Sequence, residues 1–152
     1  MMQSQVHSRV PEFLYYLLAA IGFVGTQVQF LPAYLPLGFV PSLIGFVKDS
    51  VANPASTFLL VDVLVLATAA FIWMFGEARR LAMRGAWFYF VGSLLIGVST
   101  FMPLFFAMRE RRLRCGTPSG PWALQGADWL GVGLGILLCL AAMAYSLSRI
   151  PG

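Results

Sequence analysis

Charged residues are scarce in this sequence, which argues against an ordinary soluble domain. Asp, Glu, Lys and Arg make up 11% of the 152 residues, whereas 59% of the residues are hydrophobic. Soluble domains average about 25% charged and about 45–50% apolar residues. A soluble fold of this size could not bury so much apolar surface, so the composition predicts an integral membrane protein.

Histidine and cysteine are also scarce, and this excludes several kinds of catalytic site. The single histidine, His7, precedes the first apolar run, and the two cysteines are Cys115 and Cys139. No Ser-His or Cys-His pair can be built with His7 alone, and no imidazole inside an apolar run can ligate a haem. No group of residues has the spacing of metal ligands. We therefore expect neither a cofactor nor a metal site.

Four long apolar runs are present, and none of them alternates with a period of two. Because lipid offers no partner for backbone N–H and C=O groups, such runs must form helices. We predict one all-α domain over residues 1–152, an integral membrane four-helix bundle with spans at about 13–31, 54–76, 87–108 and 129–147. Prolines interrupt residues 32–52, so this segment is expected to be extended at first and helical near 41–51, either interfacial or re-entrant.

The net charge of +4 comes from basic residues that lie mostly at the ends of the apolar runs. This pattern is typical of membrane flanks and not of nucleic-acid binding. We expect a multi-pass protein of the bacterial inner membrane whose partners are lipids and other membrane-protein subunits, with no nucleic acid. Four spans would divide the basic residues five against five, which leaves the orientation open. One side would hold Arg9, Arg79, Arg80, Arg84 and Arg149, and the other Lys48, Arg109, Arg111, Arg112 and Arg114.

Asp62 is the only acid in the middle of an apolar run, and a carboxylate inside a span is a functional-site candidate by default. It lies eight residues after Pro54, about 12 Å along the helix. If the second and third spans form an antiparallel hairpin, Asp62 faces Ser99 and Thr100. Asp62 is then either a structural hydrogen-bond anchor, a general acid or a ligand contact. The polar cluster predicted around it comprises Gln27, Trp73, Glu77, Ser99 and Thr100.

Charged groups close the second and third predicted spans. Glu77, Arg79 and Arg80 end one span, and Arg109 and Arg111 end the other. Such residues fix the depth of a span and pair with each other or with lipid phosphates. The alternative is that one of these arginines binds a phosphate or diphosphate head group.

A series of short motifs runs in order through about residues 15–113. They are Asn-Pro, an Asp in the next span, Glu-x-Arg-Arg-Leu, an aromatic cluster, Gly-Val-Ser, Pro-Leu-Phe and Arg-Glu-Arg. In this order the chain resembles the bacterial membrane-protein family known as domain of unknown function 2834. The resemblance implies the membrane architecture and no established activity, and the arginine-rich loop and fourth span are additions to it. The motif residues are Asn53, Pro54, Asp62, Glu77, Arg79, Arg80, Leu81, Trp87, Gly97, Val98, Ser99, Pro103, Leu104, Phe105, Arg109, Glu110 and Arg111.

Two functions are compatible with these features. Small residues in the third and fourth predicted spans favour a structural or accessory subunit that packs closely against other helices or lipids. The alternative is an enzyme or binder for an apolar isoprenoid-like molecule, of the cyclase or isomerase type, in which Asp62 supplies the proton and nearby aromatic rings stabilise a cation. This second hypothesis rests on a fainter resemblance to membrane enzymes that act on isoprenoids.

Overall fold

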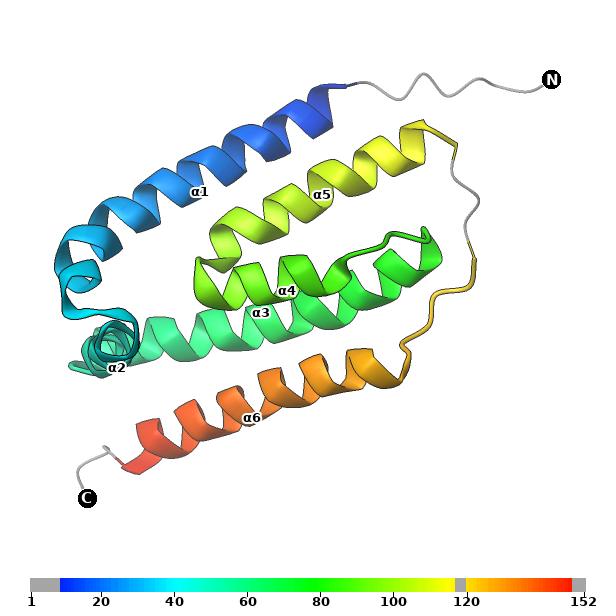
Figure 1. Cartoon of the computed structure of the whole chain (residues 1–152). Helices are drawn as coiled ribbons and strands as arrows, with labels where there is room; N and C mark the ends of the chain where they lie inside the picture. Colours follow the sequence, from blue (N-terminus) through cyan, green and yellow to red (C-terminus); the bar gives the residue numbers. More distant parts are fainter. Residues whose placement is uncertain (1–8, 117–119, 149–152) are drawn as a thin grey trace. The chain divides into compact units, whose positions relative to one another are not determined.

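The computed structural model describes residues 9–116 and 120–148, and every regular element in these ranges is a helix (Figure 1). The all-α prediction is confirmed. His7 and Arg149 lie outside the described residues. The elements are α1 (Val10–Tyr34), the short 3-10 helix η1 (Leu35–Leu37), α2 (Phe39–Ser50), α3 (Pro54–Arg80), α4 (Ala86–Leu95), α5 (Val98–Arg114) and α6 (Gly126–Ser148).

Within the described residues, three helical stretches are long and apolar enough to cross a membrane. They are Val10–Leu37, Pro54–Arg80 and Gly126–Ser148. Each contains one of the predicted spans, and together they mark the chain as a membrane protein. The predicted count of four spans is not confirmed.

The helices belong to two compact units. Unit one holds residues up to Thr26 together with Gly76–Ala123, and unit two holds Gln27–Phe75 together with the residues from Leu124 on. Helices α1 and α3 each contribute to both units.

Unit one contains a helical hairpin where the sequence predicted a third span. Helix α4 ends at Leu95 and α5 begins at Val98. Between them, Gly97 has φ 151° and ψ 138°, a conformation that favours glycine. The ring centroids of Phe88 and Phe101 lie 5.4 Å apart across the hairpin. The prediction of one helix over 87–108 is therefore wrong, because the chain reverses direction at Gly97.

Glycines allow close helix contacts in unit one. The ring of Phe101 in α5 occupies the space where a Cβ atom on Gly92 of α4 would lie. A Cβ atom on Gly22 of α1 would likewise meet the backbone of Ser99 at the start of α5. Further along, the ring centroids of Tyr15 and Phe106 lie 5.2 Å apart. The contact between Gly22 and Ser99 agrees with the expectation that a small residue of the predicted third span lets another helix approach closely.

Replacing Gly92 by Ala is expected to destabilise the protein, because the added methyl group must displace the Phe101 ring. Overpacking of this kind costs about 1–3 kcal/mol. The matched control is Gly133→Ala in α6, where an added Cβ meets nothing within 4 Å. This control should be neutral or stabilising by up to about 1 kcal/mol, since alanine favours helix more than glycine does. Thermal unfolding in mild detergent measures both, and equal shifts of the two variants would contradict the packing.

In unit two, α2 folds back on the end of α1. The ring of Phe46 packs against those of Phe30 and Tyr34, with centroid distances of 5.7 and 5.8 Å. The Tyr34 hydroxyl donates a hydrogen bond of 2.6 Å to Asp49 Oδ2. A short helix near 41–51 was predicted and is confirmed. The extended stretch expected before it is wrong, because α1 continues through Pro32 and a proline near a helix end removes only one backbone donor.

Helices α3 and α6 pack against each other in unit two. A Cβ atom on Gly135 would lie 2.8 Å from Thr68 Oγ1, and Thr68 Oγ1 lies 3.3 Å from Cys139 Sγ. One cavity is lined by residues near the start of α3 and by Ser146 near the end of α6. These contacts make the two helices antiparallel within the unit. The last turns of α6 therefore lie beside the first turns of α3.

Local signals at two helix starts were predicted correctly. Asn53 caps α3, because its Oδ1 accepts a hydrogen bond of 2.9 Å from the backbone N–H of Ser56. Pro54 is the first residue of the helix. Asp128 lies in the first turn of α6, where a negative charge is favourable. Its Oδ2 accepts a hydrogen bond of 2.9 Å from the backbone N–H of Gln125.

Candidate functional site

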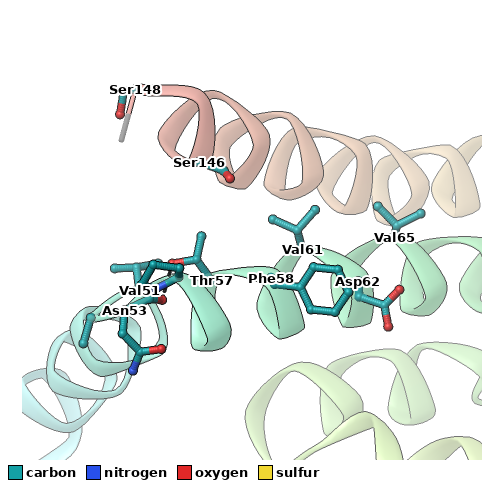
Figure 2. Close-up of a pocket in the computed structure, with 11 residues that line it drawn as sticks. Val51, Asn53, Thr57, Phe58, Val61, Asp62, Val65, Ser146 and Ser148 are labelled. Carbon is teal, nitrogen blue, oxygen red and sulfur yellow. Dashed lines mark hydrogen bonds between the residues drawn. The ribbon is translucent and has the colours of Figure 1, made fainter. Parts of the chain in front are cut away.

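A cavity of about 990 Å³ lies in unit two, between the start of α3 and the end of α6 (Figure 2). Its α3 wall includes Phe58, Val61, Asp62 and Val65, and its α6 wall includes Ser146. This volume is at the upper end of the range that holds small-molecule ligands, about 300–1,000 Å³. The cavity is thus large enough for a ligand and is lined mainly by apolar side chains.

Asp62 is the charged residue of this cavity. It is exposed, and Phe58, one helical turn earlier on α3, lines the same cavity (Figure 2). Within the described residues, no hydrogen bond or ion pair to this carboxylate is present. A carboxylate at the centre of a membrane helix costs about 2.5–3.5 kcal/mol on insertion scales. Its position in a cavity supports Asp62 as a site residue.

The other polar groups near Asp62 are largely occupied. The Thr57 hydroxyl donates a hydrogen bond of 3.0 Å to the backbone oxygen of Asn53, whose side chain caps α3. The Ser148 hydroxyl donates one of 2.7 Å to the backbone oxygen of Tyr145. The carboxylate is therefore the strongest acceptor that the cavity presents.

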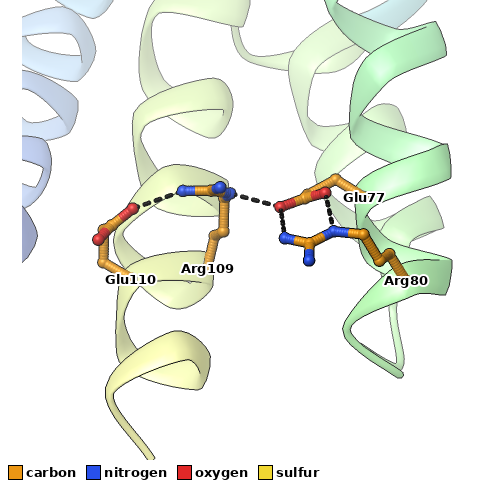
Figure 3. Close-up of polar contacts among 4 residues, drawn as sticks. All are labelled: Glu77, Arg80, Arg109 and Glu110. Carbon is orange, nitrogen blue, oxygen red and sulfur yellow. Dashed lines mark hydrogen bonds and ion pairs between the residues drawn. The ribbon is translucent and has the colours of Figure 1, made fainter. Parts of the chain in front are cut away.

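A second polar group, in unit one, is a cluster of two acids and two arginines (Figure 3). Glu77 is its centre, with 5% of its side chain exposed. Its carboxylate accepts hydrogen bonds from Arg80 at 2.6 and 2.7 Å and from Arg109 Nε at 2.7 Å. Arg109 also donates from Nη1 to Glu110 at 2.6 Å. The two negative and two positive charges balance, so this cluster is suited to a structural role, in which it holds α3 and α5 together.

A known protein family matches the region that contains the Glu77 cluster and the α3 wall of the cavity. A family described as "Protein of unknown function DUF2834" matches residues 14–111, which is more than half of the chain. The chain belongs to this family. No curated protein and no solved structure matches it.

The predicted resemblance to DUF2834 is thereby confirmed. The matched range contains Asp62 and the acids and arginines of the Glu77 cluster. Helix α6 lies beyond it, as expected for an added C-terminal segment. One wall of the cavity therefore comes from the DUF2834 region and the other from outside it.

The Glu77 cluster corrects the predicted distribution of charge. Four spans would place Arg80 and Arg109 on opposite sides of the membrane, but both arginines bind Glu77 at one end of unit one. At that end Arg114 of α5 also forms an ion pair with Glu12 of α1. The hydrogen bond with Glu12 raises the pKa of Arg114 above its usual value, so this arginine stays charged. The two arginines lie together because the α4–α5 hairpin returns the chain to the end of unit one at which α3 stops.

The other predicted site residues lie in different parts of the fold. Gln27 in α1 is half-buried and Trp73 in α3 is exposed, and both belong to unit two. Ser99 and Thr100 open α5 in unit one. Their contact with Asp62 stays a prediction. Arg79 and Arg111 are exposed; Arg79 lies between Glu77 and Arg80 in the sequence, and Arg111 directly follows Glu110.

Sequence reasoning missed Ser146 as a cavity residue. The signal that could have found it is its place in the last two turns of α6. In an antiparallel pair, those turns lie beside the first turns of α3, where Asp62 is found.

Proposed function

We propose that this chain is a multi-pass accessory subunit of the bacterial inner membrane that packs against lipids and other membrane proteins. The observation that carries this proposal is the exposure of the apolar side chains of α1. Ala19 is the only residue of α1 that is buried. Large apolar side chains are exposed over more than half of the helix circumference, given about 100° per residue. They include Phe13, Leu14, Leu17, Leu18, Ile21, Phe23, Val24, Val28 and Leu31.

A hollow on α1 supports contact with a protein partner. It is a shallow, open surface formed by Ala20, Ile21, Val24 and Gly25. Small residues on a membrane helix let the backbone of another helix approach closely. A partner helix seated on this hollow would bury the exposed face of α1.

The α4–α5 hairpin supports three crossings of the membrane. Helix α4 has 10 residues, and the apolar part of α5 ends near Met108, so each arm reaches about 15 Å along its axis. A full crossing needs about 30 Å. We therefore propose that α1, α3 and α6 cross, and that the hairpin dips into the membrane and returns to the same side.

The distribution of basic residues supports an orientation for this topology. Unit one contains eight of the ten basic residues, leaving Lys48 and Arg149. Loops rich in Lys and Arg favour the cytoplasmic side. The arginine-rich end of unit one is therefore proposed to face the cytoplasm. The eight are Arg9, Arg79, Arg80, Arg84, Arg109, Arg111, Arg112 and Arg114.

Purification of the full chain in mild detergent tests the accessory role. We expect a defined membrane protein to co-purify in constant ratio. Replacing Ala20 and Gly25 by Leu fills the hollow on α1 and should release that partner. Ala69→Leu and Ala70→Leu, on α3, add the same bulk elsewhere and serve as the control. Recovery of a lone monomer, or equal retention in both variants, contradicts the proposal.

A further inference from the structure

The cavity beside Asp62 contains a carboxylate for which the described lining residues offer no positive partner. Asp62 presents a carboxylate to the cavity, and none of the described lining residues is basic. The remaining walls are mainly apolar, with Val51, Val61 and Val65 among them. A negative group in an apolar cavity calls for a positive or hydrogen-bond-donating partner, and none of the described lining residues carries a positive charge.

Phe58 adds a second feature that favours a cation. It lies four residues before Asp62, on the same face of α3, and both side chains line the cavity (Figure 2). An aromatic face attracts an ammonium group, and the attraction grows when the site is shielded from water. The carboxylate and the ring together can hold one positive charge between them.

The walls also determine what the rest of the ligand must be. Val61 and Val65 point from α3 toward α6 and make the inner wall apolar (Figure 2). A head group bound at Asp62 lies about 12 Å along α3 from Pro54, within the apolar part of the helix. Only a molecule with an apolar body can reach this depth from the membrane.

We propose that this cavity binds a lipophilic amine, with its ammonium group at Asp62 and Phe58 and its apolar body between α3 and α6. Anionic amphiphiles are disfavoured, because the carboxylate repels them and no described basic residue faces the cavity. Neutral apolar molecules fit the volume but leave the carboxylate without a partner. This site is independent of the exposed face of α1 on which the accessory role rests.

Binding to the full-length protein in phosphatidylcholine nanodiscs tests the proposal. The probes are dodecylammonium, dodecyltrimethylammonium, dodecanol, dodecyl phosphate and farnesol, with empty nanodiscs as the blank. We expect saturable binding of the two cations, at least tenfold tighter than that of dodecanol or dodecyl phosphate. Tighter binding of dodecylammonium than of the trimethyl form would reflect a hydrogen bond to the carboxylate.

Two substitutions test whether the probes bind in this cavity. Asp62→Asn should weaken binding of the cations at least tenfold and leave dodecanol unaffected. Ser146→Phe should block all probes by filling the cavity from the α6 side while keeping the carboxylate. Asp49→Asn is the matched control, because Asp49 lies in unit two outside the cavity and is hydrogen-bonded to Tyr34.

The remaining outcomes overturn the proposal. Farnesol binding as tightly as dodecylammonium would show a site for neutral apolar molecules and would favour the isoprenoid hypothesis. Equal loss of binding in Asp62→Asn and Asp49→Asn would show a general charge effect. A crosslink from Val61 to a basic residue of a co-purifying subunit would show that a protein partner neutralises Asp62. A missing partner in the purification leaves this binding test unaffected, so the two proposals fail separately.

Discussion

Glu77→Gln is expected to be among the most destabilising single substitutions in this protein. The change keeps the volume of the side chain but removes the negative charge that both Arg80 and Arg109 contact. Breaking a buried ion pair costs about 3–5 kcal/mol, because the remaining charge loses its partner. Both arginine side chains are roughly a quarter exposed, at 29% and 25%. We therefore expect about 3 kcal/mol, the lower end of that range.

Equilibrium unfolding in mixed detergent micelles, followed by circular dichroism, measures this loss. Glu110→Gln is the matched control, since Glu110 contacts Arg109 alone and 20% of its side chain is exposed. It should cost no more than about 1 kcal/mol. The double variant Glu77→Gln with Arg109→Gln should cost less than the sum of the single changes, because the two residues interact directly. Equal effects of the two glutamate substitutions would contradict a central role for Glu77.

A reporter fused after Gly152 is expected to lie outside the cytoplasm. Three crossings put the two ends of the described chain on opposite sides, whereas four crossings put them on the same side. With the arginine-rich end in the cytoplasm, a C-terminal alkaline phosphatase should be active and a C-terminal green fluorescent protein dark. A four-span topology with Arg9 in the cytoplasm predicts the reverse for both reporters, so the two topologies give opposite signals.

The free thiol of Cys115 provides an independent check of this topology. Cys115 is exposed, directly after α5 and next to Arg114. In a Cys139→Ala background it should react with a membrane-impermeant maleimide only after the cells are permeabilised. Labelling of intact cells would place the end of α5 outside the cytoplasm and would contradict the proposed orientation.

Sequence reasoning was accurate where the signal is local. Asn53 and Pro54 set the start of α3 by capping and by a fixed backbone angle, and both act within one helical turn. Asp128 was placed correctly at the start of α6 for the same reason. Composition alone was enough for the all-α membrane architecture, because lipid leaves few alternatives.

The reversal at Gly97 was beyond this kind of reasoning. Hydropathy is continuous from Trp87 to Met108, so a single helix and a hairpin of two short helices have the same profile. What separates them is the packing of Phe101 on Gly92 and of Ser99 on Gly22, contacts between residues distant from one another in the chain. The ion pair between Glu77 and Arg109 depends on the same reversal and could not be predicted without it.

Only part of the cavity could be predicted from the sequence. Asp62 was recognised because a charge in an apolar run is unusual. The opposite wall comes from α6, and Ser146 could have been placed near Asp62 only by assuming that α6 pairs antiparallel with α3. Its place depends on the approach of α6 to α3, which is set farther along by Gly135 and Thr68.

The α4–α5 hairpin also sets an order of events during membrane insertion. An apolar arm of about 15 Å is too short to be held by lipid alone, so the hairpin depends on Gly22 of α1 and Glu77 of α3. Both partners are synthesised before Arg109. The order of synthesis thus delivers the receiving surfaces first. A permuted chain that began at α4 would have to insert its hairpin before either surface existed.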